Sequence, residues 1–113
     1  MRPSVLARVV YGSGLLVAPK TVLRLIGGSV EDRVLILAAR ALGVRHLLQA
    51  AWTVLTPTRR VARLGAMADV LHAMSVLPVV AFDASRRRSV AIDVVVEAAL
   101  GGAGALEAAQ LSA

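Results

Sequence analysis

The 113-residue chain contains no cysteine, so it can form neither a disulfide nor a thiolate metal site. Aromatic residues make up only 3% of it, and its 7 acidic residues face 13 basic ones. Long apolar runs are missing as well. The longest without a formal charge, residues 70–82, has thirteen residues when His72 is counted as neutral, whereas about 18 would mark a membrane span outright. A membrane location must therefore be argued from the balance of side chains, and the redox compartment stays undecided.

Small and aliphatic side chains dominate what is present. Hydrophobic residues make up 58% of the chain and the mean hydropathy is +0.74, above the apolar share of roughly 45–50% in soluble domains. Abundant glycine and alanine suit helices that pack closely in a bilayer. The length allows one domain, residues 1–113, and no linker suggests a second.

The net charge of +6 comes from twelve arginines and a single lysine. A basic balance is typical of nucleic-acid-binding proteins. Here, however, the arginines cluster at the ends of apolar segments, as expected of cytoplasmic loops and of contact with anionic lipid. We therefore predict a lipid bilayer and no nucleic acid as partner. No P-loop, dinucleotide fingerprint, nucleophile elbow or zincin motif is present, so we expect neither an enzyme nor a cofactor.

Apolar segments separated by helix breakers predict an all-α protein. We expect a small membrane-embedded bundle of about four helices, with a short amphipathic interfacial helix after the first. Ser29 is the expected N-cap of the third segment, and Thr56-Pro57 its end. Pro78 is expected to kink the fourth segment or to free a carbonyl. The predicted helices cover about residues 4–18, 19–27, 30–55, 61–82 and 90–111.

The first segment has the charge-then-apolar pattern of a signal peptide. Cleavage after Ala18 would face Pro19, and Leu16 stands where a small residue is needed, so we expect the segment to be retained. Residues 5–18 span only ~21 Å as a helix, less than the ~30 Å of a hydrocarbon core. The segment therefore thins the bilayer, extends through Pro19, or does not cross fully.

Residues 19–27 predict the interfacial helix. Pro19 suits a first helical turn, Lys20 and Arg24 share one face, and Gly27-Gly28 ends the segment. Aliphatic residues supply the opposite side. The membrane–water interface is the expected location, and a soluble helix on a protein core is the alternative.

The free energies of inserting these side chains favour a membrane location over a soluble four-helix bundle. In residues 34–56, Arg40 and Arg45 would cost up to ~2.5–3.5 kcal/mol each at the centre of a helix, while ten Leu, Ile and Val residues return ~0.3–0.6 kcal/mol each. This helix is marginal alone and should need its neighbours. Residues 64–82 should insert more easily, because only Asp69, His72 and Pro78 oppose insertion. The two segments have too few polar residues to cover a soluble bundle.

Charged residues inside these segments are the candidate site, because buried charges in a membrane need partners. Asp93 and Glu97 follow each other at one helical turn and repel unless a cation or a proton lies between them. Arg40 and Arg45 are the expected partners, since a guanidinium is forked and stays charged. The candidate cluster comprises Arg40, Arg45, His46, Gln49, Asp69, His72, Asp93 and Glu97.

Two interpretations of this cluster stay open. One is a static ion-pair network that holds marginal helices together, and the other is a polar relay or ligand pocket. For His46 a hydrogen-bonded packing role is expected. A metal site from His46, His72 and Asp69 lacks a tight ligand motif, so no metal is predicted.

A small-residue stripe on the last segment offers a second contact surface. Gly101, Ala105 and Ala109 recur every four residues, the spacing of small-xxx-small helix packing. We expect this stripe to support a homo- or hetero-oligomer.

Several short motifs resemble those of a known family. Gly43-Val-Arg-His-Leu-Leu-Gln49, Asp69-Val-Leu-His-Ala73 and Gly14-Leu-Leu-Val-Ala-Pro19 look like parts of small, uncharacterised four-helix membrane proteins of actinobacteria. The likeness spans nearly the whole chain. It implies a multi-pass protein of the cell membrane but carries no activity.

The sequence therefore predicts an accessory or scaffold component of a membrane assembly, and the alternative is a small transport or proton-relay protein.

The topology of the chain in the membrane depends on the first segment. If all four long segments cross, the basic residues divide into Arg2, Arg8, Arg59, Arg60 and Arg63 on one side and Lys20, Arg24, Arg33, Arg86, Arg87 and Arg88 on the other. That count gives no orientation under the positive-inside rule. If the first segment only dips into the bilayer, the division becomes eight against three. We expect four crossings, because a fourth helix is needed to cover the charged faces of residues 30–55.

Overall fold

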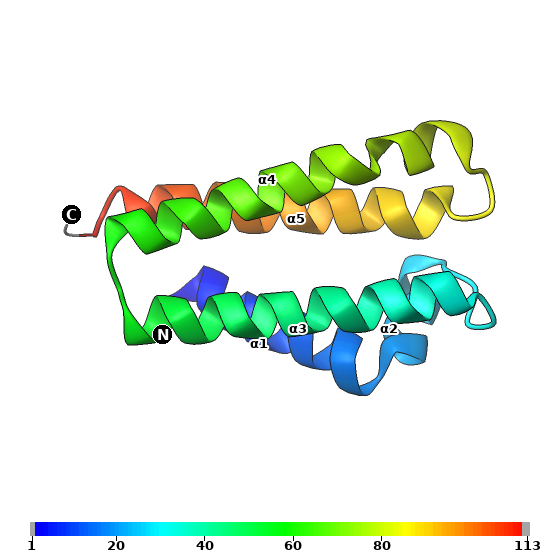
Figure 1. Cartoon of the computed structure of the whole chain (residues 1–113), viewed down its shortest axis with the longest axis horizontal. Coiled ribbons are helices and arrows are strands. Elements are labelled where there is room, and N and C mark those ends of the chain that lie inside the picture. Colours follow the sequence, from blue (N-terminus) through cyan, green and yellow to red (C-terminus); the bar gives the residue numbers. More distant parts are fainter. Residues whose placement is uncertain (1, 112–113) are drawn as a thin grey trace.

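The computed structural model describes residues 2–111 and contains five helices, with no strand in that range (Figure 1). They are α1 (Pro3–Val17), α2 (Pro19–Ile26), α3 (Arg33–Leu55), α4 (Arg59–Phe82) and α5 (Arg87–Ala108). The predicted all-helical bundle, with a short helix after the first, is confirmed. Helices α3, α4 and α5 are long and apolar enough to cross a membrane.

The starts of two long helices are fixed by side-chain caps. Asp32 accepts hydrogen bonds from the backbone N–H groups of Val34 and Leu35, at 3.0 and 3.3 Å, and α3 begins directly after it. The prediction that Ser29 caps this helix is wrong, because the Ser29 hydroxyl accepts from the Glu31 N–H within the preceding turn. Thr58 caps α4 in the same way as Asp32 caps α3.

The chain turns sharply between the first two helices. Pro19 begins α2, and the axes of α1 and α2 differ by 110°. At the other end of α2, Gly27 adopts a left-handed conformation with φ 81°, which glycine enters without a Cβ clash. Leu23 is buried while Lys20 and Arg24 are exposed, so α2 has the predicted two-sided character.

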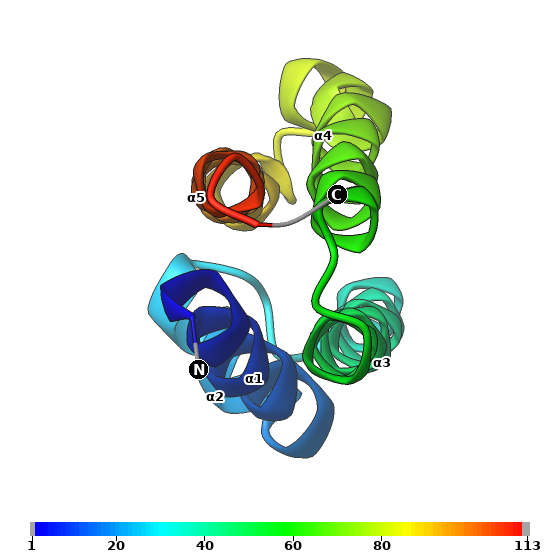
Figure 2. The same cartoon turned by 90° about the vertical axis from the view of Figure 1, so that its left-hand side faces the viewer.

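The long helices form two layers, one of α1 and α3 and the other of α4 and α5 (Figure 2). In the first layer two glycines let the backbones touch. A Cβ built on Gly43 would lie 2.7 Å from the Gly12 carbonyl oxygen and 2.8 Å from the Leu16 nitrogen. Such close approach is the usual use of small residues between packed helices. It brings α1 near enough to α3 for its polar side chains to reach the space between the layers.

The layers also meet at the turn between α4 and α5. Arg86 forms ion pairs with Asp32, at 2.8 Å, and with Asp83, at 3.2 Å. The hydrogen bond from Arg86 is the main reason why the pKa of Asp32 lies below its ordinary value. The α2–α3 connection and the α4–α5 turn thus lie at the same end of the bundle (Figure 1).

Helix α4 continues through Pro78 to Phe82, so the proline does not end it.

The close approach of α1 and α3 generates a first prediction. Replacing Gly43 by Val should separate the two helices, because the added carbons meet backbone atoms that cannot move aside. We expect a loss of about 1–3 kcal/mol in the free energy of unfolding, the usual cost of overpacking a core. Unfolding in detergent, followed by circular dichroism, measures it. Gly102→Val is the matched control, because a Cβ on Gly102 meets nothing within 4 Å; equal losses in both variants would contradict the close contact.

Candidate functional site: a buried charge cluster between the two layers

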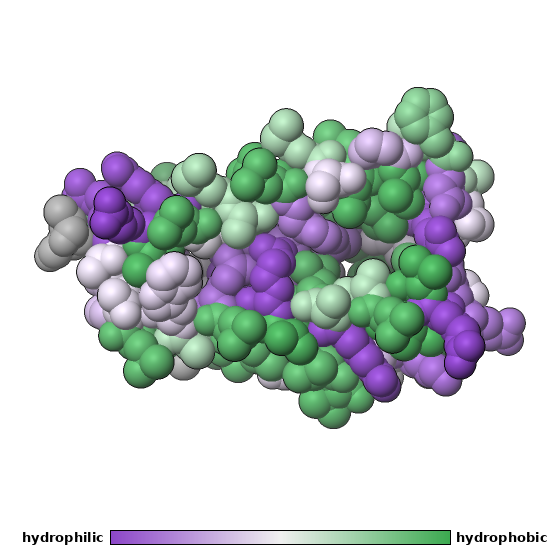
Figure 3. All heavy atoms as spheres, in the orientation of Figure 1, coloured by the Kyte–Doolittle hydropathy of each residue, from purple (hydrophilic) through white to green (hydrophobic). Residues whose placement is uncertain are grey.

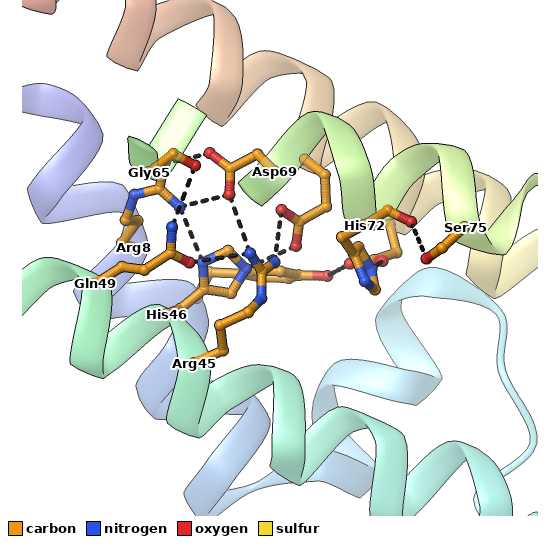
Figure 4. Close-up of polar contacts among 11 residues, drawn as sticks. Arg8, Arg45, His46, Gln49, Gly65, Asp69, His72 and Ser75 are labelled. Carbon is orange, nitrogen blue, oxygen red and sulfur yellow. Dashed lines mark hydrogen bonds and ion pairs between the residues drawn. The ribbon is translucent and has the colours of Figure 1, made fainter. Parts of the chain in front are cut away.

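Polar side chains fill the space between the two layers at mid-length of the bundle (Figure 4). The cationic side chains come from one layer and the carboxylates from the other. Arg8 lies on α1 and Arg45 on α3, whereas Asp69 lies on α4 and Asp93 and Glu97 on α5. The contact between the layers is therefore an electrostatic one across a low-dielectric space.

Arg8 and Asp69 form the central ion pair. Nη1 of Arg8 donates to Oδ1 of Asp69 at 2.7 Å, and Nη2 of Arg8 donates to Oδ2, so the pair is bidentate. Arg8 is 4% exposed and Asp69 is 0% exposed. A buried charge without a partner is strongly unfavourable, and each of these residues makes the burial of the other tolerable.

His46 links this pair to α5, and its neighbours define its tautomer. Its Nδ1 lies 3.2 Å from Nη1 of Arg8, and its Nε2 lies 2.7 Å from Oε1 of Glu97. A guanidinium can only donate, so Nδ1 must accept. The proton is then on Nε2, which donates to Glu97. His46 is thus a neutral, fully buried connector, with the hydrogen-bonded packing role that the sequence predicts.

Arg45 closes the network from the side of α3. It donates to Glu97 at 3.1 Å and to Gln49 at 3.0 Å, and its Nη1 lies 3.5 Å from Asp69. The Gln49 amide in turn donates to the Gly65 carbonyl of α4 at 3.2 Å. The Arg45 side chain is 27% exposed, so it forms the accessible edge of the cluster.

Asp93 belongs to a separate polar group next to this network. It accepts a hydrogen bond from the Tyr11 hydroxyl at 2.7 Å and another from Nε2 of His72 at 2.7 Å. The Tyr11 ring also packs edge-on against the ring of His46, with centroids 5.5 Å apart. No guanidinium contacts Asp93 within residues 2–111, in contrast to Asp69 and Glu97.

Counting formal charges shows where the cluster is balanced. Arg8 and Arg45 carry two positive charges, which offset the carboxylates of Asp69 and Glu97. Asp93 is left with Tyr11 and His72. The cluster is neutral overall only when His72 is an imidazolium, when one carboxyl carries a proton, or when a cation binds next to Asp93.

Two groups of acidic and histidine side chains come close enough to share a cation. Ligand atoms of His46, Asp69 and Glu97 lie within 4.8 Å of one another, and so do those of His72, Asp93 and Glu97. In the first group, Arg8 already contacts His46 and Asp69, and Arg45 already contacts Asp69 and Glu97. The set His46, His72 and Asp69, considered from sequence, is divided between the two groups.

The structure brings together seven of the eight predicted cluster residues. Arg40 is the exception: its side chain is exposed on α3, outside the contacts of the cluster. The expectation that Arg40 answers the acidic pair of α5 is corrected accordingly. Arg45 pairs with Glu97 of α5, Asp93 contacts His72 instead of a guanidinium within residues 2–111, and Arg8 pairs with Asp69 of α4. In the predicted small-residue stripe, Gly101 packs on α4, with Asp69 and Ala66 within 3.5 Å of a Cβ built on it, while Ala105 and Ala109 are exposed.

Sequence reasoning missed Arg8 and Tyr11. Both lie on α1, three residues apart, and therefore share a face. Arg8 is the only charge between residues 5 and 18. The rule that a charge inside an apolar helix needs a partner identifies it as a member of the cluster.

No protein-family model matches the chain, and neither a curated protein nor a solved structure shows significant similarity to it. The resemblance to actinobacterial membrane proteins therefore stays a prediction.

The cluster generates a prediction about stability. Arg8→Leu leaves Asp69 buried without its bidentate partner, and breaking a buried ion pair from one side typically costs ~3–5 kcal/mol. Arg40→Leu removes the same charge from an exposed position and should change the free energy of unfolding by less than about 0.5 kcal/mol. Thermal unfolding of both variants in one detergent measures the difference. Similar stability of Arg8→Leu and the wild type would remove the ion pair from the account of the fold.

Proposed function

We propose that the chain is a multi-pass protein of the cell membrane that serves as an accessory or scaffold component of a membrane assembly. The observation that carries the proposal is its inverted distribution of side chains. Arg8, His46, Asp69 and Glu97 are at most 4% exposed, whereas Leu37, Leu48 and many other aliphatic residues are more than half exposed. A soluble protein places these classes the other way round.

The exposed apolar side chains cover much of the molecular surface. Figure 3 shows hydrophobic patches along both layers and hydrophilic residues towards the two ends of the bundle and at one central patch. Exposed contiguous apolar surface of this extent marks contact with lipid or with other proteins. The ends, with their arginines, suit the headgroup regions.

The centre of the bundle supports a structural role for the cluster. Asp69 and Glu97 are fully buried and each contacts a guanidinium, and His46 is held as a neutral connector between Arg8 and Glu97. Such mutual compensation rigidifies a bundle and fixes the register of its helices. A rigid four-helix unit with an apolar exterior suits a subunit that binds neighbouring membrane proteins.

The path of the first helices supports four crossings. Near the start of α1, the Ser4 N–H donates to Glu107, close to the end of α5, at 3.1 Å. After α2, a Cβ on Gly28 would lie 3.1 Å from Ser89, at the start of α5. The α1–α2 unit thus runs along α5 over nearly its full length.

Because Arg8 is buried, the basic residues at the two ends divide into Arg2, Arg59, Arg60 and Arg63 against Lys20, Arg24, Arg33, Arg86, Arg87 and Arg88. The positive-inside rule then favours the second set as cytoplasmic.

This topology is a testable prediction. Reporter fusions at the N-terminus and after Ser29 should lie on opposite sides of the membrane, with the fusion after Ser29 in the cytoplasm. The protein should also stay in the membrane pellet after alkaline carbonate extraction, because its exposed apolar side chains would have to enter water on release. Fusions on the same side would contradict four crossings, and release by carbonate would contradict membrane integration.

A specific observation favours proton relay as a second candidate function. Glu97 belongs to both groups of ligand atoms, so titratable side chains follow one another from Asp69 through Glu97 to Asp93, with no separation above 4.8 Å within each group. Small hollows approach this series from both ends. One of about 20 Å³ reaches Arg8 beside Ser4 and Glu107, and another of about 100 Å³ reaches His72 and Asp93.

Proton flux distinguishes the two functions. In liposomes with an imposed pH gradient, a scaffold should leave the proton leak at the level of protein-free vesicles. A relay should raise it, and Glu97→Gln should then abolish the increase, because the middle of the series is lost. Asp83→Asn is the matched control, since this carboxylate lies at the end of the bundle beside Arg86. Flux that Glu97→Gln abolishes and Asp83→Asn retains would overturn the scaffold proposal.

The scaffold role has a positive test in native membranes. After mild solubilisation the wild-type protein should migrate with a defined partner protein, in a complex larger than the single chain in its micelle. Migration as a single chain under conditions that preserve other membrane complexes would contradict this role.

A further inference from the structure

An apolar hollow of about 100 Å³ lies between the two layers, next to the charge cluster. All five helices contribute to it. Its wall includes Leu15 of α1, Leu23 of α2, Leu35 and Leu42 of α3, Val76 of α4 and Val90 of α5. Tyr11, His72 and Asp93 line it as well and are its main polar groups. An apolar cavity with a few convergent polar groups is the usual form of a small-molecule site.

The polar end of the hollow holds the one carboxylate of the cluster that no guanidinium contacts within the described residues. Asp69 and Glu97 are matched by Arg8 and Arg45, but the partners of Asp93 are a phenol and an imidazole. The Asp93 side chain is 12% exposed and the His72 side chain 23% exposed, so both retain accessible surface. A carboxylate in apolar surroundings favours a cation beside it. The hollow therefore offers one anionic end and a long apolar wall.

The hollow opens between α3 and α4. These helices are joined directly by residues 56–58 but make few contacts along their length. Figure 3 shows the surface hollowed between them, beside the central hydrophilic patch. If α3 and α4 cross the membrane as proposed, this opening faces the hydrocarbon region rather than water. A ligand that enters here has to dissolve in lipid.

We propose that this hollow binds a small lipophilic monocation, a primary amine on a single alkyl chain, whose ammonium group lies beside Asp93. The ammonium would donate to the free surface of the carboxylate and the chain would lie along Leu15, Leu42 and Val76. The hollow, at about 100 Å³, is smaller than the ~150 Å³ cavity that accommodates benzene. A slender chain therefore fits only with its end extending through the opening between α3 and α4, and a diacyl lipid is excluded. The proposal rests on the proposed membrane location but not on the scaffold role.

Three probes with one chain and different head groups test the charge requirement. Hexylamine, hexan-1-ol and hexanoate are titrated into the full-length protein in nanodiscs of zwitterionic lipid, with empty nanodiscs as the reference for partitioning. Saturation-transfer NMR and calorimetry measure binding. We expect hexylamine to bind at least tenfold more tightly than hexan-1-ol and hexanoate to bind least. Equal binding of amine and alcohol, or stronger binding of hexanoate, would overturn the proposal, because His72 would then supply the cation that Asp93 needs.

Two substitutions, each with a matched control, test whether the probes bind in this hollow. Asp93→Asn keeps the shape of the side chain and should reduce the preference for hexylamine over hexan-1-ol at least tenfold, whereas Asp83→Asn, at the end of the bundle, should leave it unchanged. Val76→Phe should abolish binding of both probes by filling the hollow. Leu77→Phe is its control, because Leu77 is 48% exposed on the neighbouring face of α4. Wild-type binding by Val76→Phe would overturn the proposal even if Asp93→Asn does not fold.

Discussion

The Arg8–Asp69 ion pair is the interaction on which the rest of the structure depends. It joins α1 to α4, and hence one layer to the other, at a point where both side chains are almost fully removed from solvent. Around it the same division repeats: Arg45 and His46 of α3 face Glu97 of α5, and Tyr11 of α1 faces Asp93. Apolar packing operates mainly within each layer, and charge operates between them. This arrangement suits a bilayer, where lipid tails compete with apolar contacts between helices but offer nothing to a buried ion.

Such a core holds only if each buried charge finds its partner, which constrains the backbone. Arg8 can reach Asp69 because Gly12 and Gly43 let α1 approach α3 to backbone contact. His46 can connect Arg8 to Glu97 only as the Nε2-protonated tautomer, since the guanidinium occupies its other nitrogen. The one carboxylate outside this arrangement, Asp93, borders the apolar hollow. The balanced part of the cluster therefore supports rigidity, and the unbalanced part is where a ligand or proton would act.

Much of the fold follows from the sequence, because apolar segments and breakers define helices locally. The helix ends differ by a few residues where a capping side chain decides them, as Asp32 does in place of Ser29. Seven cluster residues were predictable because ionisable side chains inside apolar helices need partners. The choice of Arg40 over Arg8 was wrong for a different reason. Periodicity within one helix shows which residues share a face, but not which neighbouring helix that face meets. The 110° turn after α1, which helps to determine that pairing, is not encoded in the hydropathy of either helix.

A double-mutant cycle on Arg8 and Asp69 measures directly whether their ion pair holds the two layers together. The measurement is the free energy of unfolding in detergent for Arg8→Leu, Asp69→Leu and the double variant. Each single variant leaves one buried charge without its partner, whereas the double variant removes both charges. We predict that the double variant is more stable than either single variant, with a coupling energy of at least about 3 kcal/mol, at the upper end of values for directly interacting residues. Additive effects of the two substitutions would show that the layers are not held together by this ion pair, and would contradict the account.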